Sequence, residues 1–259
     1  MSVVVRPVRF TDNVDSMRAF LITLGLQPRV ESVSGGWVDM VAGGGASPGG
    51  GMVALHSARD SARQAPSGLT SLSFEAGDVD VLAKRLGAAG VPDVTVYDEA
   101  YGRVLSCRDP LGDEIAVDER STDLYGYRVN ESGHAKAGWQ VLAARFTDPL
   151  GPYGAFLEAL GMQRRGGSSA HFAAYGFSGG AHGAVGLHPP TDKAGPHLDE
   201  PGAIRLSFQT TEPLAAVAAR LEANRVPVLQ RQEAFGFVLE ISDPDGIAVE
   251  VFAAPEASA

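Results

Sequence analysis

Two histidines stand at matching places in the two halves of the chain. Gly51–His56 (Gly-Met-Val-Ala-Leu-His) pairs with Gly183–His188 (Gly-Ala-Val-Gly-Leu-His), so each histidine ends an apolar segment that is typical of a strand. Because imidazole titrates near neutral pH, either histidine could serve as a general base, contact a ligand or bind a metal. A histidine bonded to a local carbonyl at the end of a strand is the structural alternative.

Charged candidates lie mainly in the second half. Arg205 carries a permanent charge on a planar guanidinium, which suits a carboxylate, a phosphate or a phenolate; a surface salt bridge is the alternative. Glu250 follows Gly246 of an Asp-Pro-Asp-Gly turn by four positions, whereas Ala116 stands at the equivalent place in the first half. Asp39 could bind a cationic ligand or lie solvated near a turn.

Aromatic side chains are the third group of candidates, because planar rings stack on aromatic ligands. Trp37 pairs with His171 in the repeat. Trp139, Tyr101 and Phe235 fall on strands or turns that we expect to border the same sites. Packing in a core or at a rim is the alternative for each ring.

A duplicated sequence positions all of these residues. Arg9–Asp12 (Arg-Phe-Thr-Asp) returns 136 positions later as Arg145–Asp148, and Leu24-Gly25 returns as Leu160-Gly161 with the same spacing. With small shifts, further matches are Leu72–Phe74 with Leu206–Phe208, Arg85-Leu86 with Arg220-Leu221, and Asp109-Pro110 with Asp243-Pro244. The chain therefore consists of two related halves.

Each half is predicted to contain two strand-helix-strand-strand-strand units. In the first unit, Val3–Phe10 is a strand, and Asp12 or Asn13 caps a helix that Gly25 ends. The fold class is therefore α+β, with four tandem units. We expect a first domain at 1–120, a linker at 121–137, a second domain at 138–254 and a tail at 255–259.

The composition describes a globular chain, which we expect to be cytoplasmic. No apolar run approaches the roughly 20 residues that a membrane-spanning helix needs, and no secretory signal is evident. The single cysteine, Cys107, excludes an intramolecular disulfide and fits a reducing compartment. A net charge of −10 argues against nucleic acid as a partner.

The order of these signals resembles the vicinal oxygen chelate (VOC) superfamily, which includes glyoxalase I, bleomycin-resistance proteins and extradiol dioxygenases. The signals are Phe-Thr-Asp before a helix ending in Leu-Gly, a Gly-Val-x-Leu-His-like strand and the Asp-Pro-Asp-Gly turn. The resemblance implies two glyoxalase/bleomycin-resistance-like domains, whose curved mixed sheets form cups that hold a ligand. Enzymes of this family place a divalent metal there, held by His, Gln or Glu.

The metal positions that the resemblance implies are incomplete. There are four such positions, and each has one residue in the first half and one in the second: Val5 and Val141, His56 and His188, Ser71 and Arg205, and Ala116 and Glu250. Only His188 and Glu250 could serve together as ligands, with Gln140 or His171 as a third. Gln140 is next to Val141 and would point to the opposite face of its strand unless the register shifts by one.

We therefore expect a protein that binds a small organic molecule, an aromatic one among the candidates, without a complete metal site or other cofactor. The expected contacts are His56, Trp37, Tyr101, His171, His188, Arg205, Phe235 and Glu250. The alternatives are a lyase, isomerase or dioxygenase with Ni, Zn, Mn or Fe in the second domain, and a metal-free enzyme with a histidine base. No membrane or nucleic-acid partner is expected, and the chain would form a monomeric pseudo-dimer or a homodimer.

Overall fold

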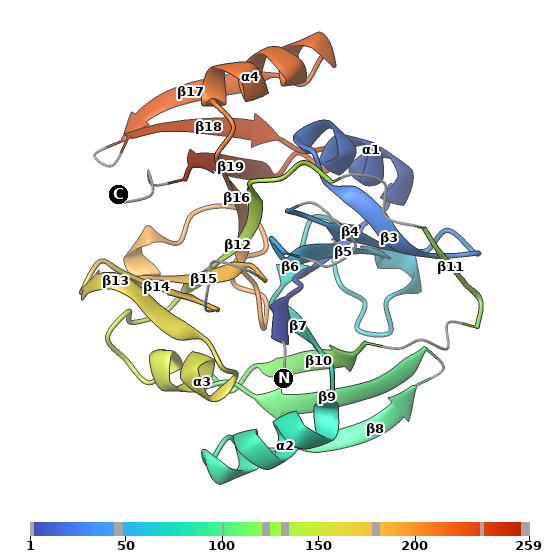
Figure 1. Cartoon of the computed structure of the whole chain (residues 1–259), viewed down its shortest axis with the longest axis vertical. Helices are drawn as coiled ribbons and strands as arrows, with labels where there is room; N and C mark the ends of the chain where they lie inside the picture. Colours follow the sequence, from blue (N-terminus) through green and yellow to red (C-terminus); the bar gives the residue numbers. More distant parts are fainter. Residues whose placement is uncertain are drawn as a thin grey trace.

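The computed structural model describes residues 3–43, 49–99, 101–120, 125–130, 135–177, 182–233 and 236–254, with the side chains of 167 and 168 left aside. Four units follow one another, each with one helix and a group of strands, which confirms the predicted α+β class (Figure 1). No helix of the described residues is long and apolar enough to cross a membrane.

The first half runs from β1 to β10. Its elements are β1 (Val3–Val5), β2 (Val8–Thr11), α1 (Val14–Leu24), β3 (Gln27–Ser32), β4 (Trp37–Val41), β5 (Met52–Ser57), β6 (Thr70–Ser71), β7 (Ser73–Ala76), α2 (Val79–Ala88), β8 (Thr95–Glu99), β9 (Gly102–Arg108) and β10 (Glu114–Glu119).

The second half runs from β12 to β19. Its elements are β12 (Trp139–Phe146), α3 (Tyr153–Ala159), β13 (Gln163–Ser169), β14 (Phe172–Gly176), β15 (Ala184–His188), β16 (Arg205–Thr210), α4 (Leu214–Ala223), β17 (Val228–Glu233), β18 (Gly236–Ser242) and β19 (Ala248–Ala253).

Local sequence sets the ends of α1 as predicted. The Asn13 side chain accepts a hydrogen bond from the Ser16 backbone N–H at 3.1 Å, which caps the helix start. Gly25 ends the helix with a φ of 112°, a left-handed conformation that a side chain would disfavour. Met17, Phe20, Leu21 and Leu24, the predicted apolar face, are buried.

The two halves build their sheets differently. In the second half, β12 and β16 are unbroken, and one eight-stranded sheet has the order β13-β14-β15-β12-β16-β19-β18-β17. In the first half, the equivalent strands are interrupted at Arg6-Pro7 and at Leu72, which leaves two sheets, β1-β7-β10-β9-β8 and β11-β3-β4-β5-β2-β6. Pro7 lacks the N–H that a continuous ladder would need.

The predicted linker at 121–137 contains structure of its own. β11 (Tyr127–Val129) pairs antiparallel with β3 and so extends a sheet of the first half. Part of the Gly43–Gly51 loop, residues 44–48, lies outside the described residues.

Repeated motifs bind one half to the other in reciprocal pairs. Arg9 donates to Asp243 at 2.5 Å, and its counterpart Arg145 donates to Asp109 at 2.9 Å. Both guanidiniums are buried, so each motif pair forms a charged contact between the halves. The Arg-Phe-Thr-Asp motif of each half therefore contacts the Asp-Pro turn of the other half.

The helices repeat this reciprocity. In α4, Arg220 donates to the Thr23 carbonyl of α1 at 2.9 Å; in α2, its counterpart Arg85 donates to the Glu158 carbonyl of α3 at 2.8 Å. As a result, α1 lies beside α4, and α3 lies beside α2, at opposite ends of the molecule in Figure 1.

Candidate ligand-binding cups

Each half has one sheet face turned away from its helices. The face of the first half that carries Trp37 and Asp39 is called the first cup, and the face of the second half that carries Leu142 and Glu250 the second cup. Along β12, buried and half-buried residues alternate. This alternation gives the two sides of the strand opposite environments.

The alternation corrects the register inferred from the sequence. Val141 is fully buried in the apolar core, whereas Gln140 and Leu142 are half-buried on the second cup. The position predicted for a first-strand ligand is thus taken by Leu142 in the second half and by Arg6 in the first. A shift of one residue exchanges the two faces of a strand, so Gln140 lies on the cup side.

Both candidate histidines lie between two aromatic rings. His56 contacts Phe10 and Trp37, with ring centroids 5.4 and 5.3 Å away. His188 contacts Phe146 and Phe172 in the same way, at 6.0 and 5.0 Å. The structural counterpart of Trp37 is therefore Phe172, and the pairing of Trp37 with His171 was wrong by one position.

The two histidines differ in their polar surroundings. His56 Nδ1 lies 2.7 Å from the Ser57 carbonyl, the local bond that the alternative interpretation anticipated. Burial, together with the charge of nearby Arg205, lowers the pKa of His188 below its usual value, and Asp192 offsets this only in part. His188 is therefore neutral at physiological pH and can accept a hydrogen bond from a ligand.

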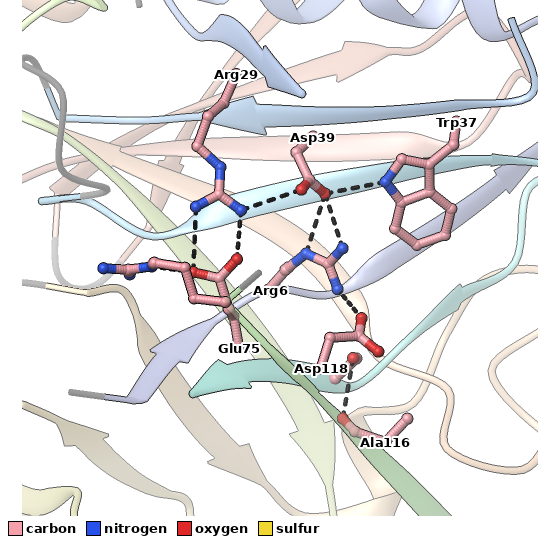
Figure 2. A network of polar contacts seen from close by, with 9 residues as sticks. Arg6, Arg29, Trp37, Asp39, Glu75, Ala116 and Asp118 are labelled. Carbon is pink, nitrogen blue, oxygen red and sulfur yellow. Dashed lines mark hydrogen bonds and ion pairs between the residues drawn. The ribbon is translucent and has the colours of Figure 1, made fainter. Parts of the chain in front are cut away.

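A charged network fills the middle of the first cup (Figure 2). Asp39 accepts from Arg6 at 3.0 Å, from Arg29 at 3.1 Å and from the Trp37 indole N–H at 3.3 Å. Arg29 also donates to Glu75 at 3.2 Å, and further contacts of the network are Arg6 with Asp118 and Arg120 with Glu75.

The charged groups of this network pair with one another. Burial penalises the charged form of Asp39, but Arg6 and Arg29 outweigh this penalty and hold its pKa below the usual value. Arg6 touches the Trp37 ring as well, with Cζ 5.0 Å from the ring centroid. Side chains that could bind a ligand from solution thus bind one another.

The same positions are small or uncharged in the second cup. The sheet registers align Asp39 with Ala174, Ala54 with Gly186 and Val8 with Ala144. Glu75 corresponds to Gln209 and Arg6 to Leu142. Arg165 is the counterpart of Arg29, but the two carboxylates that Arg29 contacts are replaced by Ala174 and Gln209. No described carboxylate forms an ion pair with Arg165.

Arg205 and Glu250 meet in the second cup. Their side chains are 3.9 Å apart, while Arg231 donates to Glu250 at 2.5 Å. The Arg205 guanidinium also donates to the Ala194 carbonyl at 2.8 Å and lies 5.1 Å from the centre of the Phe146 ring. Arg205 thereby ties the segment after β15 to the rim of the cup.

The other predicted contacts are scattered. Tyr101 is half exposed, and burial with nearby Asp118 raises its pKa to about 12, so its hydroxyl stays protonated at neutral pH. His171 is exposed in the turn between β13 and β14. Phe235 lies outside the described residues. Trp139 is buried in the core and donates to Glu212, so it does not border a cup.

A hollow of about 360 Å³ opens over β17, β18 and β19. Its lining includes Leu229, Glu240, Ser242 and Ala248, and Glu240 pairs with Glu250 in the sheet register. The hollow therefore continues the second cup beyond Glu250. Its size is within the range of small-molecule pockets.

Comparison with solved structures relates this architecture to known proteins. A Mn(II)-bound glyoxalase from Novosphingobium aromaticivorans matches with a TM-score of 0.62 at 15% identity, over 96% of this chain and 80% of that one. A 2,3-dioxygenase from Pseudomonas sp. KL28 matches with a TM-score of 0.61 at 15% identity, over 98% and 94%. A catechol 2,3-dioxygenase gives 0.60 at 14% identity, over 97% and 87%.

The chain has the vicinal oxygen chelate fold. This confirms the resemblance stated from the motifs. No protein-family model matches the chain, and the search of curated proteins found no match. The sequence identities to these solved structures are low, so the similarity is one of fold alone.

The charges around the family's metal position in this VOC fold are unfavourable for a divalent cation. Glu250 is contacted by Arg231 and Arg205, and Arg205 also lies beside His188. Gln140 accepts from Arg165 at 3.3 Å. A metal at this place would have to displace or approach three guanidinium groups, which repel it.

Several residues of the cups escaped the sequence analysis. Arg6, Arg29, Glu75 and Asp118 were not recognised, because their partners lie far apart in sequence and because the strand of Arg6 was assigned the wrong register. Arg165 could have been found by aligning it with Arg29 and noticing that the second half lacks an aspartate at Ala174 and a glutamate at Gln209.

Proposed function

We propose that the second half of this VOC-fold protein binds a small organic molecule in its cup without a divalent metal. The observation that carries the proposal is the difference between the two cups at equivalent positions. Where Asp39 is held by two arginines in the first cup, the second cup has Ala174, in one cross-strand row with Gly186 and Ala144. Phe146 and Phe172 lie two residues from Ala144 and Ala174 on the same strands, so their rings border this row.

The surrounding groups suit an organic ligand with an aromatic or other apolar body. Phe146, His188 and Phe172 provide ring faces and edges on one side of the row. A β-carbon added to Gly186 would lie 3.2 Å from the Phe172 ring and 3.4 Å from His188 Nε2, so both side chains pack closely over this glycine. The imidazole therefore leans over the floor of the cup, where it can hydrogen-bond a ligand.

The alternative, a metal-dependent VOC enzyme, predicts a different outcome for purified protein. Under our proposal, protein prepared with added Mn, Fe, Ni or Zn retains no stoichiometric metal. Stoichiometric metal that is lost in Glu250→Ala would contradict the proposal, because Glu250 is the only carboxylate at the implied metal positions.

Filling the cup tests the binding site directly. Ala144→Leu adds a side chain at the floor of the second cup, and Val8→Leu is the matched change at the equivalent place of the first half. We expect small aromatic acids and their amides, screened by thermal shift and calorimetry, to lose binding to Ala144→Leu and to keep binding to Val8→Leu. Equal losses in the two variants, or none, would contradict the location.

A further inference from the structure

Arg165 is unusual among the guanidiniums that lie inside this molecule. Arg6, Arg9, Arg29 and Arg145 each contact at least one carboxylate. Arg165 is half-buried, and its contacts are to neutral oxygens, the Gln140 side chain and the Phe177 carbonyl, both at 3.3 Å. Burial lowers its pKa, and no acidic group among the described residues opposes the shift.

A glycine makes room for this guanidinium. A β-carbon on Gly176 would lie 2.1 Å from Arg165 Nε, 2.2 Å from Cζ and 2.3 Å from Nη2, closer than any real contact allows. In the first half, the equivalent position on β4 is Val41. Gly176 is therefore a cradle that lets the charged group of Arg165 lie flat against the sheet.

The cradle lies at one end of an uncharged path across the second cup. From Gly176, the sheet register leads through Ala184, Leu142 and Ser207 to Glu250. Four strand spacings span about 19 Å along the sheet, which accommodates a small organic molecule lying across the strands. Of the side chains between the two charged ends, Leu142 is the only bulky one.

We infer that Arg165, cradled by Gly176 and oriented by Gln140, is an anion subsite that binds the carboxylate of a small organic acid in the second cup. This rests on the proposed function of that cup. Arg165 donates to Gln140 and to the Phe177 carbonyl, and a planar guanidinium with five N–H groups can also form a bidentate pair with a carboxylate. The apolar body of the acid would lie over Leu142, toward the rings around His188.

The probes for this subsite are phenylacetate and its neutral isostere phenylacetamide. Calorimetry on the full chain compares the wild type with Arg165→Met, Gly176→Ala and Arg164→Met. Arg164 is the matched control, because it is the next residue, carries the same charge and contacts Tyr175 on the other side of the strand.

We expect Arg165→Met to weaken phenylacetate binding roughly ten- to a hundredfold, the range for a charged hydrogen-bonded pair, and to leave phenylacetamide binding unchanged. Gly176→Ala keeps the charge but displaces the guanidinium, so it should also weaken phenylacetate selectively. Arg164→Met should bind both probes as the wild type does.

Two results would overturn the subsite. One is unchanged phenylacetate binding in Arg165→Met, and the other is an equal loss in Arg164→Met, which would indicate a general effect of net charge. If both probes bind the second cup and Arg165→Met has no effect, only the subsite fails. If neither probe binds the wild type, the proposed function fails and the subsite with it.

Discussion

Replacing Asp39 should lower the free energy of unfolding far more than a substitution at an exposed position. Asp39 is 3% exposed and accepts hydrogen bonds from Arg6, Arg29 and Trp37. In Asp39→Asn, the buried Arg6 and the half-buried Arg29 lose their shared counter-charge, although Arg6 keeps Asp118 and Arg29 keeps Glu75. Breaking a buried ion pair on one side costs about 3–5 kcal/mol of the free energy of unfolding.

For a chain of this size, that loss corresponds to a decrease of roughly 6–20 °C in Tm, at about 2–4 °C for each kcal/mol. Urea unfolding followed by circular dichroism at pH 7 gives the free energy, and calorimetry gives Tm. Asp98→Asn is the control with the same change in charge, since its side chain is 87% exposed. We expect the control to lie within about 0.5 kcal/mol of the wild type.

The pH dependence supplies a second readout. Because the folded-state pKa of Asp39 is lowered, its carboxylate adds stability above the unfolded pKa of about 3.9, and this contribution disappears as the pH falls through the folded-state pKa. The wild type and Asp39→Asn should therefore converge in stability in acid. A loss under about 1 kcal/mol at pH 7 would refute the account of the network.

Three further predictions concern other buried groups. Burial raises the pKa of Cys107 to about 12, so the native thiol should not react with a thiol reagent at pH 8, whereas urea should expose it; rapid reaction of the folded protein would contradict this. His188 should titrate below its usual pKa in an NMR experiment, and Arg205→Gln should raise that pKa; a His188 pKa that does not change in the variant would contradict the role of Arg205. Arg145→Met leaves Asp109 buried without its guanidinium and should cost about 3–5 kcal/mol in urea unfolding, against little change for the exposed Arg164→Met.

Local signals made much of the fold predictable from the sequence. The helix that begins after Asn13 and ends at Gly25 was predicted from a capping side chain, an apolar face and a glycine, and all three act as expected. The duplication gave the order of the four units. It did not show that the repeated Arg9 and Asp243 motifs contact each other, because sequence repetition says nothing about which copies meet.

The faces of the strands were harder to predict. A shift of one residue on β12 exchanged Val141 with Gln140 and Leu142, and another on β14 exchanged His171 with Phe172. Short apolar strands tolerate either reading, since nothing in their composition fixes which side meets the helices. The ion pairs of the first cup were missed because partners such as Arg6 and Asp39 lie far apart in the sequence.

We propose that the second cup, and not the first, holds a small organic acid. A crystal structure of the full chain with phenylacetate tests it most directly. We expect the ligand over Leu142, with its carboxylate paired to Arg165 and its ring near His188, and an unchanged Arg6–Asp39 pair in the first cup. Phenylacetate bound in the first cup, or oriented in the second cup with its carboxylate away from Arg165, would contradict it.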